Sequence, residues 1–143
     1  MIYFDTAYLA KCYLTDQGHE AVRALAATDQ VACCELGRVE VAAAFHRVFR
    51  ERKMTAAMHR SVCRQFAMDE ETGLWVWFPA TSAILHKAAA RMNTMDQAVF
   101  VRAADAIHLT CAAEHGFTEI YSSDRHLLAA ASAFGLRPRN VIR

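Results

Sequence analysis

Two aspartates near opposite ends of the chain follow short β-prone runs, where ligand chemistry is common in α/β proteins. Asp5 comes after Ile2–Phe4, and Asp124 comes after Ile120–Ser122. Ligands bind outside the carboxyl ends of the strands in parallel sheets, so we expect both carboxylates at one sheet edge. Each aspartate taken alone is equally well explained as the N-cap of the helix that follows it.

Two further acids lie inside apolar stretches with helical spacing. Asp105 lies within AADAIHLTCAA, and Glu40 lies within RVEVAAAF. A carboxylate among core-facing side chains is costly unless it is paired with a cation or bound to a metal. An arginine partner (Arg38, Arg47 or Arg102) or a helix face turned toward solvent would also accommodate either acid.

Taken together, the four acids predict a cation site. Carboxylates that share a pocket repel one another, and some of their pKa values rise until a proton is retained. Two Mg²⁺ ions would bring four positive charges against these four negative charges, and Mg²⁺ prefers hard oxygen ligands of this kind. Two such ions, about 3.5–4 Å apart, activate a water and stabilise the leaving oxygen when a phosphodiester is cleaved. The pattern therefore favours metal-dependent phosphodiester cleavage.

The elements that must position these acids alternate along the chain. Short β-prone runs are expected at Ile2–Phe4, Val31–Cys34, Trp75–Phe78, Ile120–Ser122 and Val141–Ile142. Helical spacing is expected around Leu9–Tyr13, Ala21–Ala26, Leu36–Arg52, Thr55–Glu71, Thr81–Met92, Ala98–His115 and Asp124–Phe134. Strands that alternate with helices predict a three-layer α/β/α sandwich around a mainly parallel sheet of four to five strands.

The composition is that of an ordinary globular protein. The chain has 143 residues, which is the length of one domain. Apolar residues make up 55% and charged residues 22%, which excludes intrinsic disorder and low-complexity architecture. The formal net charge of +1 gives no bulk attraction to nucleic acid or to a membrane surface.

The cysteines and the amino-terminal segment indicate a reducing compartment. The five cysteines include no C-x-x-C pair, which argues against a zinc site. The chain starts with MIYFDTAYLAKCYL and has no basic segment there, so no secretory signal is predicted. No stretch approaches the ~18 uncharged apolar residues that a membrane span needs. We therefore expect a cytoplasmic protein with no membrane partner.

Four pieces of the sequence, in this order and spacing, resemble the acidic motifs of the PIN-domain ribonucleases. They are YFDTAYLAKCYL, CCELGRVEVAAAFHR, VRAADAIHLTCAAEHG and IYSSDRHLLAAASAFGL. The chain is most similar to the VapC-type toxins of bacterial toxin–antitoxin pairs, and the resemblance covers nearly its whole length. It implies a single PIN-like domain over residues 1–143.

The resemblance implies endonucleolytic cleavage of RNA that depends on Mg²⁺ or Mn²⁺. By position, the family's catalytic acids and metal ligands correspond to Asp5, Glu40, Asp105 and Asp124. Ser122 stands where the family often has a Thr or Ser near the metal, and Thr6 is a second candidate for such support. The implied partners are the RNA substrate, a small cognate antitoxin that occludes the acidic groove, and a second copy of the chain in a homodimer.

Two departures from the family pattern bear on activity. Ala7 and Cys34 stand where the family usually has Ser, and the loss of two hydroxyls weakens the support of the metal ligands. This leaves open a second interpretation, a PIN-like module that binds protein or RNA without turnover. His108, three residues after Asp105, is expected to be a core histidine with a satisfied ring.

A third interpretation, a phospho-accepting α/β domain, is disfavoured. A haloacid-dehalogenase-like phosphatase would need a second Asp two residues after Asp5, where this chain has Ala7. A receiver domain would need an Asp at the end of its third strand, and here Trp75–Phe78 is followed by Pro79 and Ala80.

Overall fold

The computed structural model describes residues 1–142 of the chain. The strands are β1 (Ile2–Tyr3), β2 (Val31–Cys34), β3 (Trp75–Phe78), β4 (Glu119–Tyr121) and β5 (Arg137–Arg139). The helices are α1 (Thr6–Lys11), α2 (His19–Ala26), α3 (Leu36–Arg50), α4 (Ala56–Glu71), α5 (Ser82–Asn93), α6 (Ala103–Glu114), α7 (Arg125–Ala130) and the 3-10 helix η1 (Ala131–Phe134). Within the described residues, no helix has both the length and the apolar character that crossing a bilayer requires.

The strands pair in parallel and lie in the order β3-β2-β1-β4-β5. Between β1 and β4 the pairing is short: Phe4 forms one bridge with Tyr121, and the Asp5 N–H donates to the Tyr121 carbonyl at 3.0 Å. The chain moves outward from β1 to β3 and then returns to the other side of β1 to form β4. The topological switch point, where ligands of such sheets bind, therefore lies between β1 and β4.

The two faces of the sheet belong to two separate hydrophobic cores, because successive strand side chains point to opposite faces. One core packs α1, α2, α3 and α4 against Phe4, Val31 and Cys33. The other core packs α5, α6 and α7 against Tyr3, Ala32 and Cys34. Helices thus cover both faces, and the predicted three-layer α/β/α sandwich with a parallel sheet is confirmed.

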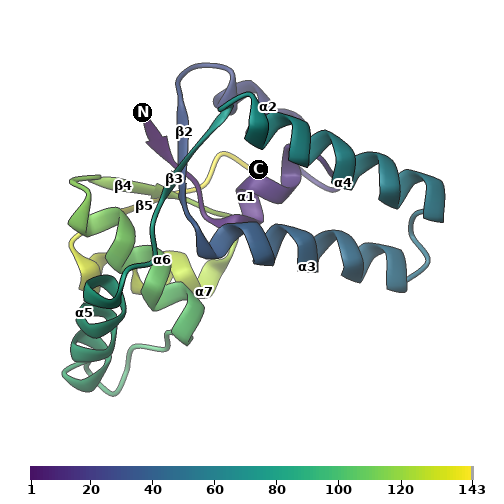
Figure 1. Cartoon of the computed structure of the whole chain (residues 1–143). Coiled ribbons are helices and arrows are strands. Elements are labelled where there is room, and N and C mark those ends of the chain that lie inside the picture. The colour runs from purple at the N-terminus through teal and green to yellow at the C-terminus, as the bar shows by residue number, and fades with distance from the viewer. Residues whose placement is uncertain (143) are drawn as a thin grey trace.

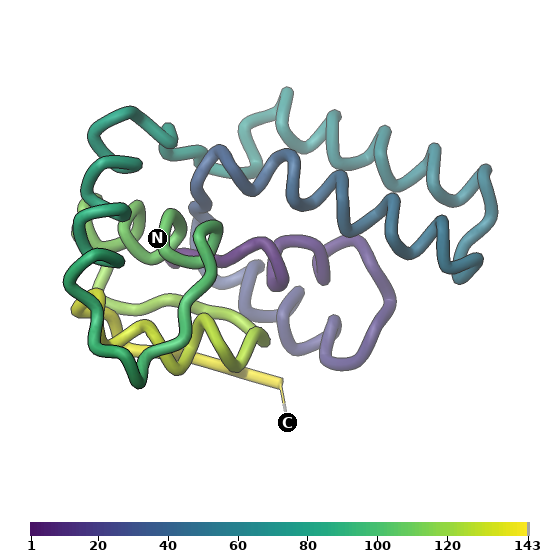
Figure 2. The backbone as a smooth tube through the Cα atoms, turned by 90° about the horizontal axis from the view of Figure 1, so that it is seen from below, coloured from purple at the N-terminus to yellow at the C-terminus, as the bar shows by residue number. Residues whose placement is uncertain are grey.

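Figures 1 and 2 show the helices in two groups that follow the chain. α1 to α4, coloured purple to teal, lie on one side, and α5 to α7, coloured teal to yellow-green, lie on the other. The α3–α4 hairpin extends well beyond the sheet in both views. Thr55 caps α4, and its hydroxyl accepts the Met58 N–H at 3.1 Å.

The last strand was predicted at the wrong residues. β5 is Arg137–Arg139, an exposed edge strand with no hydrophobic pattern, and Pro138 is tolerated there because edge strands have unpaired positions. The predicted strand Val141–Ile142 instead packs into the core of the α1–α4 face. The Val141 N–H donates to the Tyr8 hydroxyl at 2.7 Å, which holds this end of the chain against α1.

Helix α6 begins later than the predicted residue Ala98. The Asp96 side chain accepts the Ala98 N–H at 2.8 Å, and this local turn competes with helix formation. The helix therefore starts at Ala103, with Arg102 as its N-cap residue and Asp105 in its first turn.

Candidate active site

An acidic groove lies at the carboxyl edge of the sheet, beside the switch point. Its cavity volume is about 570 Å³, and residues from α1, α3, α6 and the start of α7 line it. All four acids singled out in the sequence line this groove, namely Asp5, Glu40, Asp105 and Asp124. The fold thus gathers on one surface carboxylates that come from both helical layers.

Three of the four acids lie at helix N-termini. Asp5 is the N-cap of α1 and accepts the Tyr8 N–H at 3.1 Å, and Asp124 is the N-cap of α7. Asp105 lies in the first turn of α6, while Glu40 lies about one turn into α3. The helices that return the chain across a parallel sheet begin at its carboxyl edge, and their N-termini stabilise negative charge.

Asp5 is buried, with 4% of its surface exposed. The Ser122 hydroxyl donates to Asp5 Oδ2 at 2.6 Å and in turn accepts the Asp124 N–H at 2.8 Å. Burial raises the pKa of Asp5 from 3.8 to about 6, although the hydrogen bonds from Ser122 and Tyr8 act in the opposite direction. The ionised form of Asp5 is therefore the one that a nearby cation would stabilise most.

Glu40 is held by a histidine and a threonine. Its Oε2 lies 2.5 Å from His108 Nε2 and accepts the Thr6 hydroxyl at 2.6 Å. Burial opposes ionisation of Glu40, but these hydrogen bonds outweigh it and lower the pKa of the carboxyl. His108 is buried, as expected for a core histidine, yet one ring nitrogen faces the groove and the other lies 3.3 Å from the Tyr3 hydroxyl.

Asp105 and Asp124 share one arginine. Arg102 donates through Nε to Asp105 Oδ2 at 2.8 Å and through Nη2 to Asp124 Oδ2. For Asp124, partial burial opposes ionisation, but the Arg102 hydrogen bond prevails and lowers the pKa. Of the three arginine partners considered from the sequence, Arg102 is the one that pairs with these acids.

The donor set fits a hard divalent cation, since four carboxylates present oxygen ligands of the kind that Mg²⁺ and Mn²⁺ prefer. As the side chains stand, residues 1–142 contain no group of three or more His, Cys, Asp or Glu close enough to hold a metal ion. Arg102 bridges two of the acids, while Ser122 and His108 hold the other two in place.

Hydroxyls at two other positions support the acids of the groove, although positions 7 and 34 lack the family's serines. Ala7 lines the groove, whereas Cys34 is buried in the core of the α5–α7 face. Thr6 supplies a hydroxyl to Glu40, and Ser122 supplies one to Asp5. Two of the four acids therefore each accept a hydroxyl hydrogen bond despite the departures from the family pattern.

Sequence reasoning named Arg102 as one of three possible arginine partners, but it did not predict that Arg102 bridges two acids or that His108 contacts Glu40. The spacing contained one signal for each, because Arg102 and His108 each lie three residues from Asp105, a separation at which side chains at a helix start can meet. The contact between His108 and Glu40, in contrast, joins α6 to α3 across the end of the sheet. Such a pairing depends on tertiary structure and has no local pattern.

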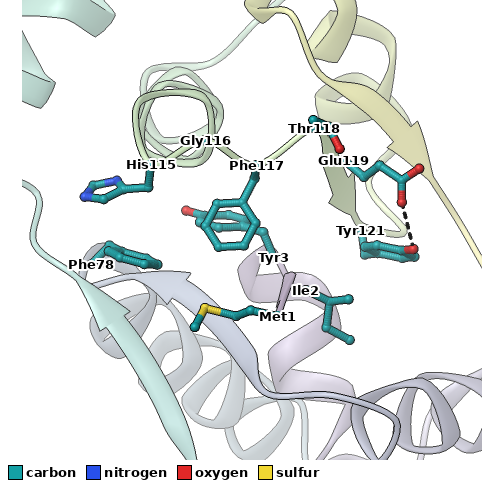
Figure 3. Close-up of a pocket in the computed structure, with 10 residues that line it drawn as sticks. All are labelled: Met1, Ile2, Tyr3, Phe78, His115, Gly116, Phe117, Thr118, Glu119 and Tyr121. Atoms are coloured by element: carbon teal, nitrogen blue, oxygen red, sulfur yellow. Dashed lines mark hydrogen bonds between the residues drawn. The ribbon is translucent and has the colours of Figure 1, made fainter.

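A second hollow, of about 410 Å³, lies beside the end of α6 and is largely aromatic (Figure 3). Tyr3, Phe78 and Phe117 contribute rings to it. Its lining residues all belong to the described part of the chain, and the one carboxylate among them is Glu119. That carboxylate accepts the Tyr121 hydroxyl at 3.1 Å and pairs with both arginines of β5. The acidic groove is thus a separate site with different chemistry.

Comparisons with known proteins agree with this architecture. The chain resembles the crystal structure of VapC20 from Mycobacterium tuberculosis, described as a sarcin–ricin loop cleaving toxin, with a TM-score of 0.71 and 17% identity over 91% of this chain and 95% of that one. It also resembles VapBC2 from Rickettsia felis bound to a DNA fragment from their promoter, with a TM-score of 0.64 and 12% identity over 98% of each chain. The comparison with curated proteins finds no match. The model of the PIN domain family matches residues 2–133, and the chain therefore belongs to the PIN domain family.

Proposed function

We propose that this protein is an endoribonuclease that uses Mg²⁺ or Mn²⁺ and is the toxin of a toxin–antitoxin pair. The observation that carries the proposal is the convergence of Asp5, Glu40, Asp105 and Asp124 on one groove at the switch point. Membership of the PIN domain family and the likeness to VapC structures add support. Residues 1–143 would act as one domain in the cytoplasm.

The four carboxylates would hold the cation and form the catalytic groove. A divalent cation bound there supplies Lewis-acid chemistry: it lowers the pKa of a water and stabilises charge on a departing oxygen. The chain's own groups set the geometry, because Ser122 orients Asp5 while His108 and Thr6 orient Glu40. Arg47 adds positive charge to the groove wall, where an RNA phosphate would lie.

The expected partners follow from the same charges. A small antitoxin would block the groove with an Arg or Lys that takes the cation's place, and Arg is favoured because its planar fork can bind a carboxylate through two hydrogen bonds. The likeness to VapBC2, which was crystallised with a DNA fragment from their promoter, supports an antitoxin partner for this chain. A homodimer is proposed on the family resemblance alone.

Cleavage of single-stranded RNA tests the proposal. The purified chain should cut RNA internally when Mg²⁺ or Mn²⁺ is present and stop when EDTA is added. Glu40→Gln and Asp105→Asn should each reduce cleavage at least about 100-fold, since one partner of a catalytic metal site is lost. Asp16→Asn is the matched control, because Asp16 lines the same groove but pairs with Lys11, outside the four acids.

A second candidate function is RNA binding without turnover. The ion pairs of Arg102 favour it, because they neutralise two of the four acids without a metal. RNA binding by the wild-type chain with no cleavage in either metal would establish this alternative and refute the nuclease.

A further inference from the structure

Arg102 occupies the place in the acidic groove where a cation belongs. Its guanidinium reaches both Asp105 and Asp124 through different nitrogens, so one planar cation spans two carboxylates from two helices. Those hydrogen bonds and the nearby negative charge raise the pKa of Arg102, which is therefore always charged here. Glu40 also lies close enough for its charge to be stabilised by the same arginine.

The arginine can leave this position at small cost. About half of its side chain (51%) is exposed to solvent, whereas the side chain of Asp105 is 12% exposed. Within residues 1–142, the Arg102 guanidinium donates hydrogen bonds to these two acids and to no other group. Its backbone is the N-cap of α6, so a change of side-chain rotamer would move the guanidinium into solvent without disturbing the helix.

We propose that Arg102 is a built-in counter-ion that competes with the divalent cation for Asp105 and Asp124 and so sets the cation affinity of the groove. This inference rests on the proposed function, because it assumes that these acids bind a divalent cation. In the metal-free protein Arg102 keeps the carboxylates from repelling one another, and a cation must displace it to gain both oxygens. The chain thus carries in itself the kind of charge that an antitoxin would insert from outside.

Removal of this arginine should tighten metal binding, even though the site loses a hydrogen-bonding group. Titration calorimetry with Mn²⁺ on the full chain should give about tenfold tighter binding for Arg102→Gln than for wild type, which corresponds to about 1.4 kcal/mol. Arg102→Lys should fall between them, because an ammonium is a point charge and lacks the fork that spans two carboxylates.

Arg47→Gln is the matched control. Arg47 lines the same groove and carries the same charge, but in the described part of the chain it forms no ion pair with the four acids. Its removal should change the Mn²⁺ affinity less than about twofold, since the charge of an exposed side chain that is not paired with these acids is screened by water and salt.

A second readout comes from thermal unfolding in EDTA and in Mn²⁺. Arg102→Gln should unfold at a lower temperature than wild type in EDTA, because the acids lose their counter-ion. Added Mn²⁺ should raise the unfolding temperature of Arg102→Gln more than that of wild type. The proposal is overturned if wild type binds Mn²⁺ and Arg102→Gln binds it equally or more weakly, and the proposed nuclease survives that result. If no variant binds Mn²⁺, wild type included, both the counter-ion and the proposed metal site are wrong.

Discussion

At the scale of single residues, the four acids of the groove differ in what compensates their charge. Asp105 and Asp124 share the Arg102 guanidinium, and Glu40 faces the His108 ring. Asp5 receives hydrogen bonds from a hydroxyl and a backbone N–H, which are uncharged donors. The electrostatic strain that the sequence suggested for Asp105 therefore belongs to Asp5, because Asp105 pairs with Arg102, a local partner three residues earlier in the chain.

The pH dependence of stability should reveal this strain. The pKa of Asp5 is about 6 in the folded chain and 3.8 in an ordinary aspartate, so the folded state binds the proton more tightly. The contribution of Asp5 to the free energy of unfolding is fully present below pH 3.8 and is lost as the pH rises through about 6. In EDTA at pH 7.5, Asp5→Asn should therefore raise the free energy of unfolding by about 1–3 kcal/mol, with no gain near pH 4.

Asp124→Asn is the informative contrast, measured by thermal unfolding under the same conditions. The pKa of Asp124 is lowered, so its charge stabilises the fold above its unfolded pKa and this contribution is lost as the pH falls. The variant should therefore be less stable than wild type at pH 7.5. A destabilised Asp5→Asn at pH 7.5 would show that the Asp5 charge is compensated in a way that these contacts do not explain.

The contact between His108 and Glu40 can be measured by a double-mutant cycle. His108→Leu and Glu40→Ala each remove one partner of the 2.5 Å contact. We expect a coupling free energy of about 1–2 kcal/mol in urea unfolding, since the pair is partly buried and hydrogen-bonded. His108→Gln, which keeps a donor, should recover part of the loss. Additive single-variant effects would mean that the two side chains do not support one another.

At the scale of elements, the groove is built from the starts of helices. The sequence predicted strands β2 and β3 residue by residue, because their apolar runs are bounded by clear breaks. It also predicted which acids would follow β1 and β4. It did not predict that α6 starts at Ala103, because that start depends on the turn made by Asp96, or that β5 lies at an exposed Arg-Pro-Arg segment. No local sequence pattern predicts the order of the strands in the sheet, and therefore none predicts the position of the switch point.

Gly37 controls how α3 meets the sheet and hence where Glu40 lies. A Cβ at this position would lie 2.7 Å from Cys33 Sγ and 3.2 Å from the Trp77 ring. Gly37→Ala should therefore shift the first turn of α3, lower the free energy of unfolding by about 1–3 kcal/mol and weaken Mn²⁺ binding. Thermal unfolding and calorimetry on the same samples would measure both effects.

Gly73→Ala provides the control for this variant. Gly73 has a φ of +73° with open space around it, so an alanine there strains only the backbone, by roughly 1 kcal/mol, far from the groove. It should lower stability and leave Mn²⁺ affinity unchanged. Equal Mn²⁺ affinities in the Gly37→Ala and wild-type chains would show that α3 does not set the position of Glu40.

At the scale of the whole molecule, the groove lies where the two helical layers meet. α1 and α3 come from one layer, and α6 and α7 come from the other, so neither half of the chain contains the site alone (Figure 2). We therefore expect toxicity to require the whole folded chain. Expression in a bacterial host should arrest growth, and Glu40→Gln at equal protein level should not.

Co-expression of the small gene next to this one should relieve that arrest, if the gene encodes the antitoxin. Pull-down of a stable complex by the Glu40→Gln chain would show that relief comes from binding. Normal growth on expression of the folded wild-type chain would contradict the toxin assignment and leave the nuclease to be judged by RNA cleavage.

The most direct test of the metal-binding groove is the anomalous scattering of manganese in crystals grown with MnCl₂. We expect an anomalous difference peak in the acidic groove, within coordination distance of at least two of the carboxylates of Asp5, Glu40, Asp105 and Asp124. We also expect Arg102 to have turned away from Asp105 and Asp124 in that crystal. A well-ordered groove without a manganese peak, with Arg102 still bridging the two aspartates at saturating MnCl₂, would contradict both expectations.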